Sequence, residues 1–281
     1  MNSPSDVNLP FFSYGVFKPG QLAFFQLIDF VTARYCESIK GELRLRDGLP
    51  IIDPDGSGEV EGMILEFKDS VNAGMAYDRI CGLEPGNHYR WDIAQSTHGP
   101  VNVLYGKSPK KGSTECEEEW DGKSDPLFSV ALDVIEKTLN ENRQFEWDLQ
   151  PMFRLEMAYL LLWSSIERYL SLRYHLGSEV SKKIANLAQE SAFRDALTKH
   201  VAREDLVFRA DEPGCRYKLD PNDPKASVNY YYQIRSNISH RGKAVTNDHK
   251  RLMLSLDELL PIFRVVLEFA FIESAPSVSL G

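Results

Sequence analysis

One stretch of this chain, YYQIRSNISHRG, combines residue types that could cleave RNA. It places Arg235 and His240 five positions apart, just before Gly242. Histidine titrates near neutral pH and can move the proton of a 2′-hydroxyl, while arginine grips a phosphate with two hydrogen bonds. On a straight helix, five positions separate two side chains by more than a third of a turn. The pattern therefore predicts a helix that ends or bends near residues 237–239, so that both groups can reach one phosphate.

Two other stretches, SYGVFKPG and LEPGNHYRWDIA, resemble motifs of the γ-glutamylcyclotransferase-like family, in the family's order. The first aligns Tyr14, Gly15, Val16 and Phe17 with the family's substrate-binding loop. The family more often has a small hydroxyl residue and a leucine after the glycine, so these two positions depart from its pattern. The second match places the family's catalytic acid on Glu84. The resemblance covers roughly residues 10–106 and rests on the order and spacing of several weak motifs.

This resemblance implies a reaction as well as a fold. In the family, the α-amine of a γ-glutamyl compound attacks its own γ-carbonyl, which gives 5-oxoproline and a free amine. Glu84 would take a proton from the amine and later pass one to the leaving nitrogen, which needs a pKa raised by partial burial. Backbone N–H groups of the loop 14–17 would stabilise the developing oxyanion. The chemistry requires no metal and no cofactor. The alternative is that Tyr14 and Gly15 merely end a strand and Glu84 a helix.

The stretch YYQIRSNISHRG is also similar to the R-x4-6-H motif of HEPN domains. The matching positions are Tyr232, Arg235, Ser236, His240 and Gly242. An earlier stretch, SSIERYL, resembles an early HEPN helix and contributes Glu167. The resemblance implies a metal-independent ribonuclease, usually with two motifs facing each other across a homodimer. Glu167 would fix Arg235, and Ser236 or Asn237 would orient His240. The alternative is a core ion pair of Arg235 with Glu167, in a bundle that only dimerises or senses a nucleotide.

The elements that must position these residues follow from local patterns. Short β-rich runs separated by DG, DPDG and GSG breakers predict a compact mixed α/β domain over residues 8–106, with a helix that ends near Gly82. The polar, charged segment 107–125 is typical of a linker. Apolar residues then recur every three or four positions, which predicts an all-helical bundle of four or five helices over residues 126–275. Its first helix is expected to start at Asp125, as N-cap, with a proline next.

Composition narrows the class of protein. The net charge of −9 over 281 residues disfavours nucleic acid as a ligand of the whole surface. Most of the acidity lies in the first 124 residues, which carry a net charge of −7, whereas the rest carries −2. The four cysteines are scattered without a CxxC pair, which indicates reduced thiols and no metal site. The sequence shows no apolar run of membrane-spanning length and no secretory signal, so a cytoplasmic location without membrane contact is expected.

The sequence-based interpretation is an α+β protein in which a γ-glutamylcyclotransferase-like mixed β-barrel/sheet domain precedes an all-α HEPN-like helical bundle. The expected catalytic residues are Glu84 in the first domain and Arg235 with His240 in the second. The expected partners are a small γ-glutamyl compound, RNA at the C-terminal domain, and a second copy bound through that domain. By analogy of fold, such a fusion suggests a defence-type system. The alternative is a non-catalytic sensor, in which the first domain binds a small ligand and the bundle dimerises or binds RNA.

Overall fold

The structure is a computed structural model of the 281-residue chain, and it separates into two compact units. The first unit comprises residues 1–126, 171–177 and 271–281, and the second comprises residues 127–170 and 178–270. The residues that the structure describes are 1–144, 149–175, 179–212, 214–241 and 246–274.

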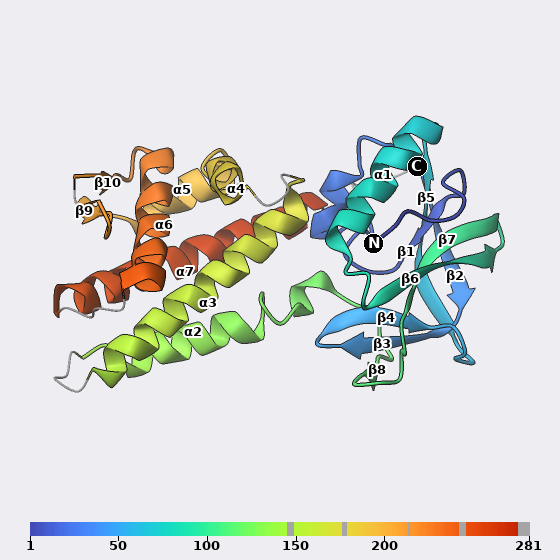
Figure 1. The fold of residues 1–281 in the computed structure, drawn as a ribbon, viewed down its shortest axis with the longest axis horizontal. Coiled ribbons are helices and arrows are strands. Elements are labelled where there is room, and N and C mark those ends of the chain that lie inside the picture. Colours follow the sequence, from blue (N-terminus) through green and yellow to red (C-terminus); the bar gives the residue numbers. More distant parts are fainter. Residues whose placement is uncertain (145–148, 176–178, 213, 242–245, 275–281) are drawn as a thin grey trace. The chain divides into compact units, whose positions relative to one another are not determined.

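The first unit is built on a five-stranded mixed sheet with the strand order β2-β5-β1-β7-β6 (Figure 1). Its strands are β1 (Phe11–Ser13), β2 (Val31–Lys40), β5 (Glu59–Phe67), β6 (Tyr89–Ser96) and β7 (Gly99–Gly106). Strand β1 is central, since it pairs antiparallel with β5 and parallel with β7. No ladder joins the edge strands β2 and β6 within the described chain, so the expected β-barrel/sheet takes the form of an open mixed sheet. The two edges meet where the Thr97 N–H donates to the Glu37 carboxylate, at 2.9 Å.

Smaller elements complete this unit. They are the 3-10 helix η1 (Leu22–Gln26), the helix α1 (Ser70–Leu83), and a second sheet of β4 (Leu49–Asp53), β3 (Glu42–Arg46) and β8 (Thr114–Glu115). The predicted DG turn joins β3 to β4, with positive φ at both Asp47 (53°) and Gly48 (78°), as a two-residue hairpin requires. The expected helix end at Gly82 falls one residue short of the observed end at Leu83.

The segment 107–125, which its polar composition predicts to be a linker, packs on the first unit. Strand β8 pairs with β3, and the 3-10 helix η2 (Gly122–Ser124) follows it. Between them lies Trp120, which is 3% exposed and donates from Nε1 to the carbonyl of Gly48 at 3.0 Å. One large apolar side chain therefore anchors a segment whose other residues are polar, because burying its ring is favourable and its N–H finds an acceptor.

The two faces of the sheet in the first unit are covered differently, as the alternation along β1 requires. Phe11 faces α1 and meets the ring of Tyr77 edge-on, with 6.3 Å between centroids. Phe12 points the other way, into a core cluster that includes Tyr14, Ile52 and residues of β5 and β7. The loop after β1 and the end of α1, which carry the residues expected to do chemistry, thus adjoin a sheet whose two faces are both packed at β1.

The second unit is mainly helical (Figure 1). Its helices are α2 (Val130–Glu141), α3 (Gln150–Arg173), α4 (Val180–Leu187), α5 (Ser191–His200), α6 (Pro224–Arg241) and α7 (Thr246–Ser274). The last residues of α3 and α7, from positions 171 and 271 onwards, belong to the first unit. The expected start of α2 at Asp125 is wrong by several residues, because Asp125 ends η2 and α2 begins at Val130, with Ser129 as its N-cap. Among the helices of the described chain, none is long and apolar enough to span a membrane.

The expectation of an entirely helical second half is also wrong. An antiparallel hairpin of β9 (Asp205–Phe208) and β10 (Arg216–Leu219) lies between α5 and α6. Each strand has only four residues, and both contain charged side chains, so neither shows an apolar alternation long enough to identify it. The hairpin is instead held by its contacts with α6, which is a tertiary effect.

Candidate functional site

The loop after β1 folds into a tight bend. The N–H of Lys18 donates to the carbonyl of Gly15 at 2.9 Å, and the N–H of Ala23 donates to the carbonyl of Val16 at 3.1 Å. Within the described part of the chain, the N–H groups of Val16 and Phe17 donate to no other group, although both residues are buried. Buried N–H groups are nearly always paired. These two are therefore candidate donors to a negatively charged ligand oxygen.

Tyr14 anchors the start of this loop. Its hydroxyl donates to the carbonyl of Leu104 at 2.5 Å, and the residue is 5% exposed. Burial raises the pKa of the Tyr14 hydroxyl well above its usual value, and the nearby Tyr89 and Glu84 raise it further. Tyr14 thus stays neutral and positions the loop. Next to it, a side chain at Gly15 would lie 3.1 Å from the ring of Pro50, so the glycine allows a close approach.

Glu84 lies directly after the last turn of α1. Its N–H donates to the carbonyl of Ile80 at 2.9 Å, and its backbone is extended (φ −87°, ψ 124°), because the next residue is Pro85. The residue is partly buried. Its negative charge contributes to the raised pKa of the Tyr14 hydroxyl, so these two groups, 70 positions apart in the sequence, interact electrostatically.

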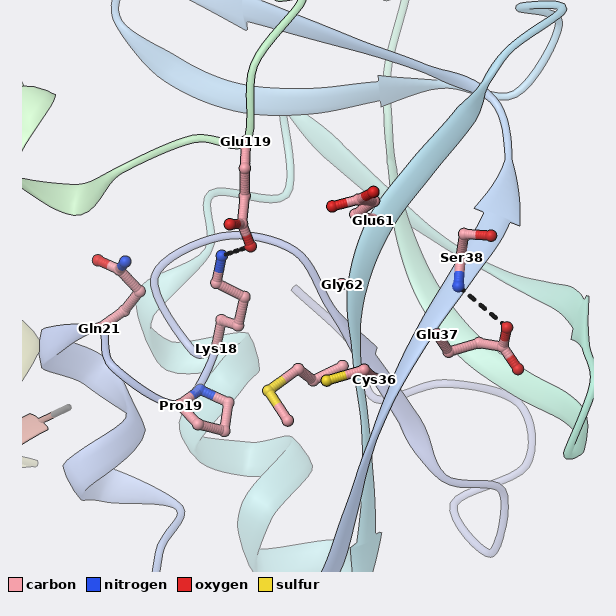
Figure 2. A pocket seen from close by; sticks show the side chains of 10 residues that line it. Lys18, Pro19, Gln21, Cys36, Glu37, Ser38, Glu61, Gly62 and Glu119 are labelled. Atoms are coloured by element: carbon pink, nitrogen blue, oxygen red, sulfur yellow. Dashed lines mark hydrogen bonds and ion pairs between the residues drawn. The ribbon is translucent and has the colours of Figure 1, made fainter. Parts of the chain in front are cut away.

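A cavity of about 720 Å³ opens beside the second half of the same loop (Figure 2). Its lining residues are Lys18, Pro19, Gln21, Cys36, Glu37, Ser38, Glu61, Gly62, Met63 and Glu119. Lys18 is 8% exposed and forms an ion pair with Glu119, which belongs to the segment 107–125. Neither Tyr14 nor Glu84 is among the lining residues, so this cavity does not include the two residues expected at the cyclisation site. Sequence reasoning missed it, because the run of glutamates indicates only a solvated segment.

In the second unit, Arg235 and Glu167 form an ion pair across α6 and α3. The guanidinium Nη2 lies 3.4 Å from Glu167 Oε1, and each side chain is about a third exposed, at 31% and 32%. The contact lacks hydrogen-bond geometry, since Oε1 accepts no hydrogen bond from the described residues. The guanidinium also lies over the ring of Tyr232, 5.7 Å from its centre, and that ring packs edge-on against Trp163. Arg235 is therefore held by one carboxylate and one ring.

The expected helix end or bend near residues 237–239 is wrong, because α6 continues through His240 to Arg241. The side chain of Asn237, expected to orient His240, binds the hairpin instead. Its Oδ1 accepts from the N–H of Ala210 at 3.0 Å, and its Nδ2 donates to the carbonyl of Phe208 at 2.8 Å. This side chain is thus used to hold the hairpin on α6. The position of Ser236 on α6 is described, whereas the side chain of His240 and the whole of Gly242 lie outside the described residues.

A charged network that joins the hairpin to α6 and α7 was also missed. Arg203 donates to both oxygens of Glu258, at 2.7 and 3.0 Å, and to Asp205 at 2.8 Å. Tyr231 donates to Glu258 at 2.9 Å, and Tyr230 donates to Asp205 at 2.6 Å. Burial, followed by the hydrogen bond to Asp205, raises the pKa of Tyr230 to about 12. All these groups satisfy one another, so the network is a clamp that fixes the hairpin.

The described residues contain no preformed metal site, because no group of three His, Cys, Asp or Glu side chains among them could hold an ion.

Comparisons with known proteins assign no family. No model of a protein family matches the chain, and no curated protein matches its sequence. One solved structure, the crystal structure of the uncharacterized protein PH0828 from Pyrococcus horikoshii, is similar to 42% of this chain and 93% of its own, at 18% identity and a TM-score of 0.33. A likeness at this score assigns neither a fold family nor an activity.

Proposed function

We propose that the first unit binds a γ-glutamyl compound and cyclises it to 5-oxoproline, with Glu84 as the acid and base. The observation that supports this most is the pairing of two features. The buried N–H groups of Val16 and Phe17 donate to no other described group, and the carboxylate of Glu84 interacts electrostatically with Tyr14, at the start of the same loop. An amide cyclisation needs such a set, namely oxyanion donors and a group that moves a proton.

The reaction follows from these groups. Glu84 takes one proton from the substrate's α-ammonium, and the neutral amine attacks the γ-carbonyl carbon, so that a C–N bond forms and the carbonyl oxygen becomes negative. The N–H groups of Val16 and Phe17 stabilise that oxygen. Glu84 then gives its proton to the leaving nitrogen, and the original γ-amide C–N bond breaks. The ring nitrogen loses a second proton to water, and the released amine takes one up, so that 5-oxoproline and an ammonium product result.

The test is the release of 5-oxoproline from γ-glutamyl dipeptides by the purified full-length chain in EDTA. Glu84→Gln keeps the size of the side chain and removes its ability to take up the proton. We expect this variant to lose activity while its thermal unfolding stays unchanged. Glu117→Gln is the matched control, because Glu117 is exposed on the segment 107–125 and lies in no proposed site. Equal rates for the wild type and Glu84→Gln would exclude Glu84 from the reaction.

A second proposal concerns the helical unit, in which Arg235 and His240 would cleave RNA without a metal ion. Its support is that the guanidinium of Arg235 remains about a third exposed, with a single carboxylate at 3.4 Å that makes no hydrogen bond among the described residues. A phosphate could therefore compete for it. Against a site within one chain stands the continuous helix, which separates positions five apart by about 140°. Such a site would take its arginine and histidine from two copies of the chain, in the homodimer expected for this unit.

RNA cleavage in EDTA, by the wild type and by His240→Ala, tests this second proposal. Activity that is lost in the variant and that rises with protein concentration in the manner of a dimer would support it. If neither protein cleaves RNA, the helical unit is better assigned to a non-catalytic role in binding or dimerisation. In that case a ligand bound in the first unit would act as a signal, and Glu84→Gln would leave the function of the protein intact.

A further inference from the structure

The cavity beside the loop of the first unit contains a lysine that is almost fully buried. Lys18 is 8% exposed, whereas its partner Glu119 is 54% exposed at the side chain. A buried ammonium group is costly unless a negative group accompanies it. Among the described residues, the carboxylate that pairs with Lys18 is that of Glu119. The pair is therefore asymmetric, since the lysine depends on a carboxylate but the glutamate can be solvated without one.

The segment that carries Glu119 reaches the cavity from outside the sheet. Figure 2 shows Lys18 extending from the loop towards Glu119, which enters from the segment 107–125. Residues 117–119 are exposed and contain no helix or strand, and Trp120 provides the nearest buried anchor. Glu119 can thus leave the cavity by a local movement of a few residues, without breaking a ladder or opening the core.

The opposite wall of the cavity adds a negative charge. Strands β2 and β5 pair Cys36 with Met63 and Ser38 with Glu61, so these four residues share one face of the sheet, which is the face of Phe11. All four line the cavity. Glu37 also lines the cavity, but its carboxylate accepts from the N–H of Thr97 at 2.9 Å and is directed away from Lys18 (Figure 2). With Glu119 withdrawn, the cavity would therefore hold one positive group, Lys18, and one exposed carboxylate that faces it from β5, Glu61.

We propose that this cavity binds a small zwitterion of the amino-acid class, and that Glu119 occupies the subsite for the ligand's carboxylate. The carboxylate of the ligand takes the place of Glu119 on Lys18, and its ammonium group lies towards Glu61. A ligand without net charge suits this cavity, because the charges of Lys18 and Glu61 cancel once Glu119 has left. The volume of about 720 Å³ admits a side chain as well as the two charged groups. This site does not include Glu84, so it is separate from the proposed cyclisation site.

Titration of the full-length protein with glycine, sodium acetate and methylammonium chloride tests this proposal, with amide chemical shifts of Lys18, Ser38 and Glu119 as the readout. Glu119→Gln removes the competing charge and keeps an oxygen that can accept from Lys18. We expect it to bind glycine about fivefold more tightly than the wild type, because the ligand no longer has to break a partly exposed ion pair, and the free energy of such a pair corresponds to about this ratio of affinities. Glu118→Gln, one position earlier and exposed, should bind as the wild type does. Lys18→Met should not bind glycine.

Each outcome decides the matter. Unchanged glycine affinity in Glu119→Gln, or no binding by any variant, overturns the proposal. Acetate that binds as tightly as glycine overturns the role of Glu61. If Glu119→Gln is too unstable to titrate, Glu119→Ala replaces it, and 50 mM acetate should raise its Tm but not that of Glu118→Ala. An absence of this rescue counts against the subsite. Because these readouts need no turnover, a failure of 5-oxoproline release leaves them unaffected.

Discussion

Removing Glu258 should destabilise the second unit far more than removing any surface carboxylate. Its side chain is 9% exposed and accepts two hydrogen bonds from Arg203 and one from Tyr231. In Glu258→Ala, the guanidinium of Arg203 loses its bidentate partner, and the hydroxyl of Tyr231, which is fully buried, loses its acceptor. The substitution therefore leaves a partly buried charge with fewer partners, and the buried hydroxyl of Tyr231 without its acceptor.

The magnitude follows from what remains unpaired. Breaking a buried ion pair by removing one partner costs roughly 3–5 kcal/mol, of which the unsatisfied hydroxyl accounts for about 1–3 kcal/mol. Arg203 keeps its contact with Asp205 at 2.8 Å and is 23% exposed, so the lower part of this range, about 3 kcal/mol, is expected. A double variant, Arg203→Met with Glu258→Leu, removes both charges together and should lose less than the single variant, because no buried charge is left alone.

Urea unfolding followed by far-ultraviolet circular dichroism measures this loss, since most of the helical signal comes from the second unit. Glu136→Gln is the surface control. Its partner, Arg264 Nη2, lies 2.9 Å away, but the two side chains are 57% and 42% exposed, so the loss should stay below about 1 kcal/mol. If Glu258→Ala lost no more stability than Glu136→Gln, or if the double variant were the least stable protein of the series, Glu258 would not be holding the hairpin to the helices.

Two further outcomes follow from the structure. Burial by itself raises the pKa of Asp205, but hydrogen bonds, first that of Tyr230, outweigh it and leave the pKa below its usual value. Its stabilisation should therefore be complete above about pH 4 and be lost as the pH falls through the lowered pKa, so that urea midpoints of the wild type and Asp205→Asn converge in acid. At Gly62, an added Cβ would lie 2.5 Å from Phe12 Cζ and 2.7 Å from a backbone oxygen, so Gly62→Ala should cost about 1–3 kcal/mol. Gly74→Ala, in α1 with open space around it, should instead stabilise the protein by about 0.5–1 kcal/mol in the same urea assay, and a similar loss at both sites would contradict the packing.

The sequence predicts those parts of the fold that local patterns determine. The DG turn at Asp47 and Gly48, the strands around it and the C-terminal end of α1 all follow from residue types within a few positions. The hairpin β9–β10 does not, because its short strands are held by Asn237 and Tyr230 of α6, which lie at least 25 positions further along the chain. The anchoring of the segment 107–125 depends in the same way on its contact with a distant β-turn.

The candidate sites show the same division. The loop Tyr14–Phe17 and Glu84 are visible as motifs, and the charge of Glu84 contributes to the raised pKa of the Tyr14 hydroxyl. The cavity beside them depends on the pair of Lys18 with Glu119, which are 101 positions apart, and no pattern in either segment indicates the other. The expected bend in α6 failed for a related reason. Spacing along a helix shows what a two-residue site would need, but α6 continues to Arg241 and the side chain of Asn237 binds the hairpin instead.

The most direct measurement of the central claim is the rate of 5-oxoproline formation from γ-glutamylglycine by the full-length protein, together with the affinity for that compound. General acid–base catalysis contributes a factor of about 10²–10⁴. Glu84→Gln should therefore lower kcat by at least about 100-fold and leave binding unchanged, while Glu117→Gln matches the wild type. A wild-type protein that binds γ-glutamylglycine but forms no 5-oxoproline, or a Glu84→Gln variant that keeps full kcat, would contradict the account.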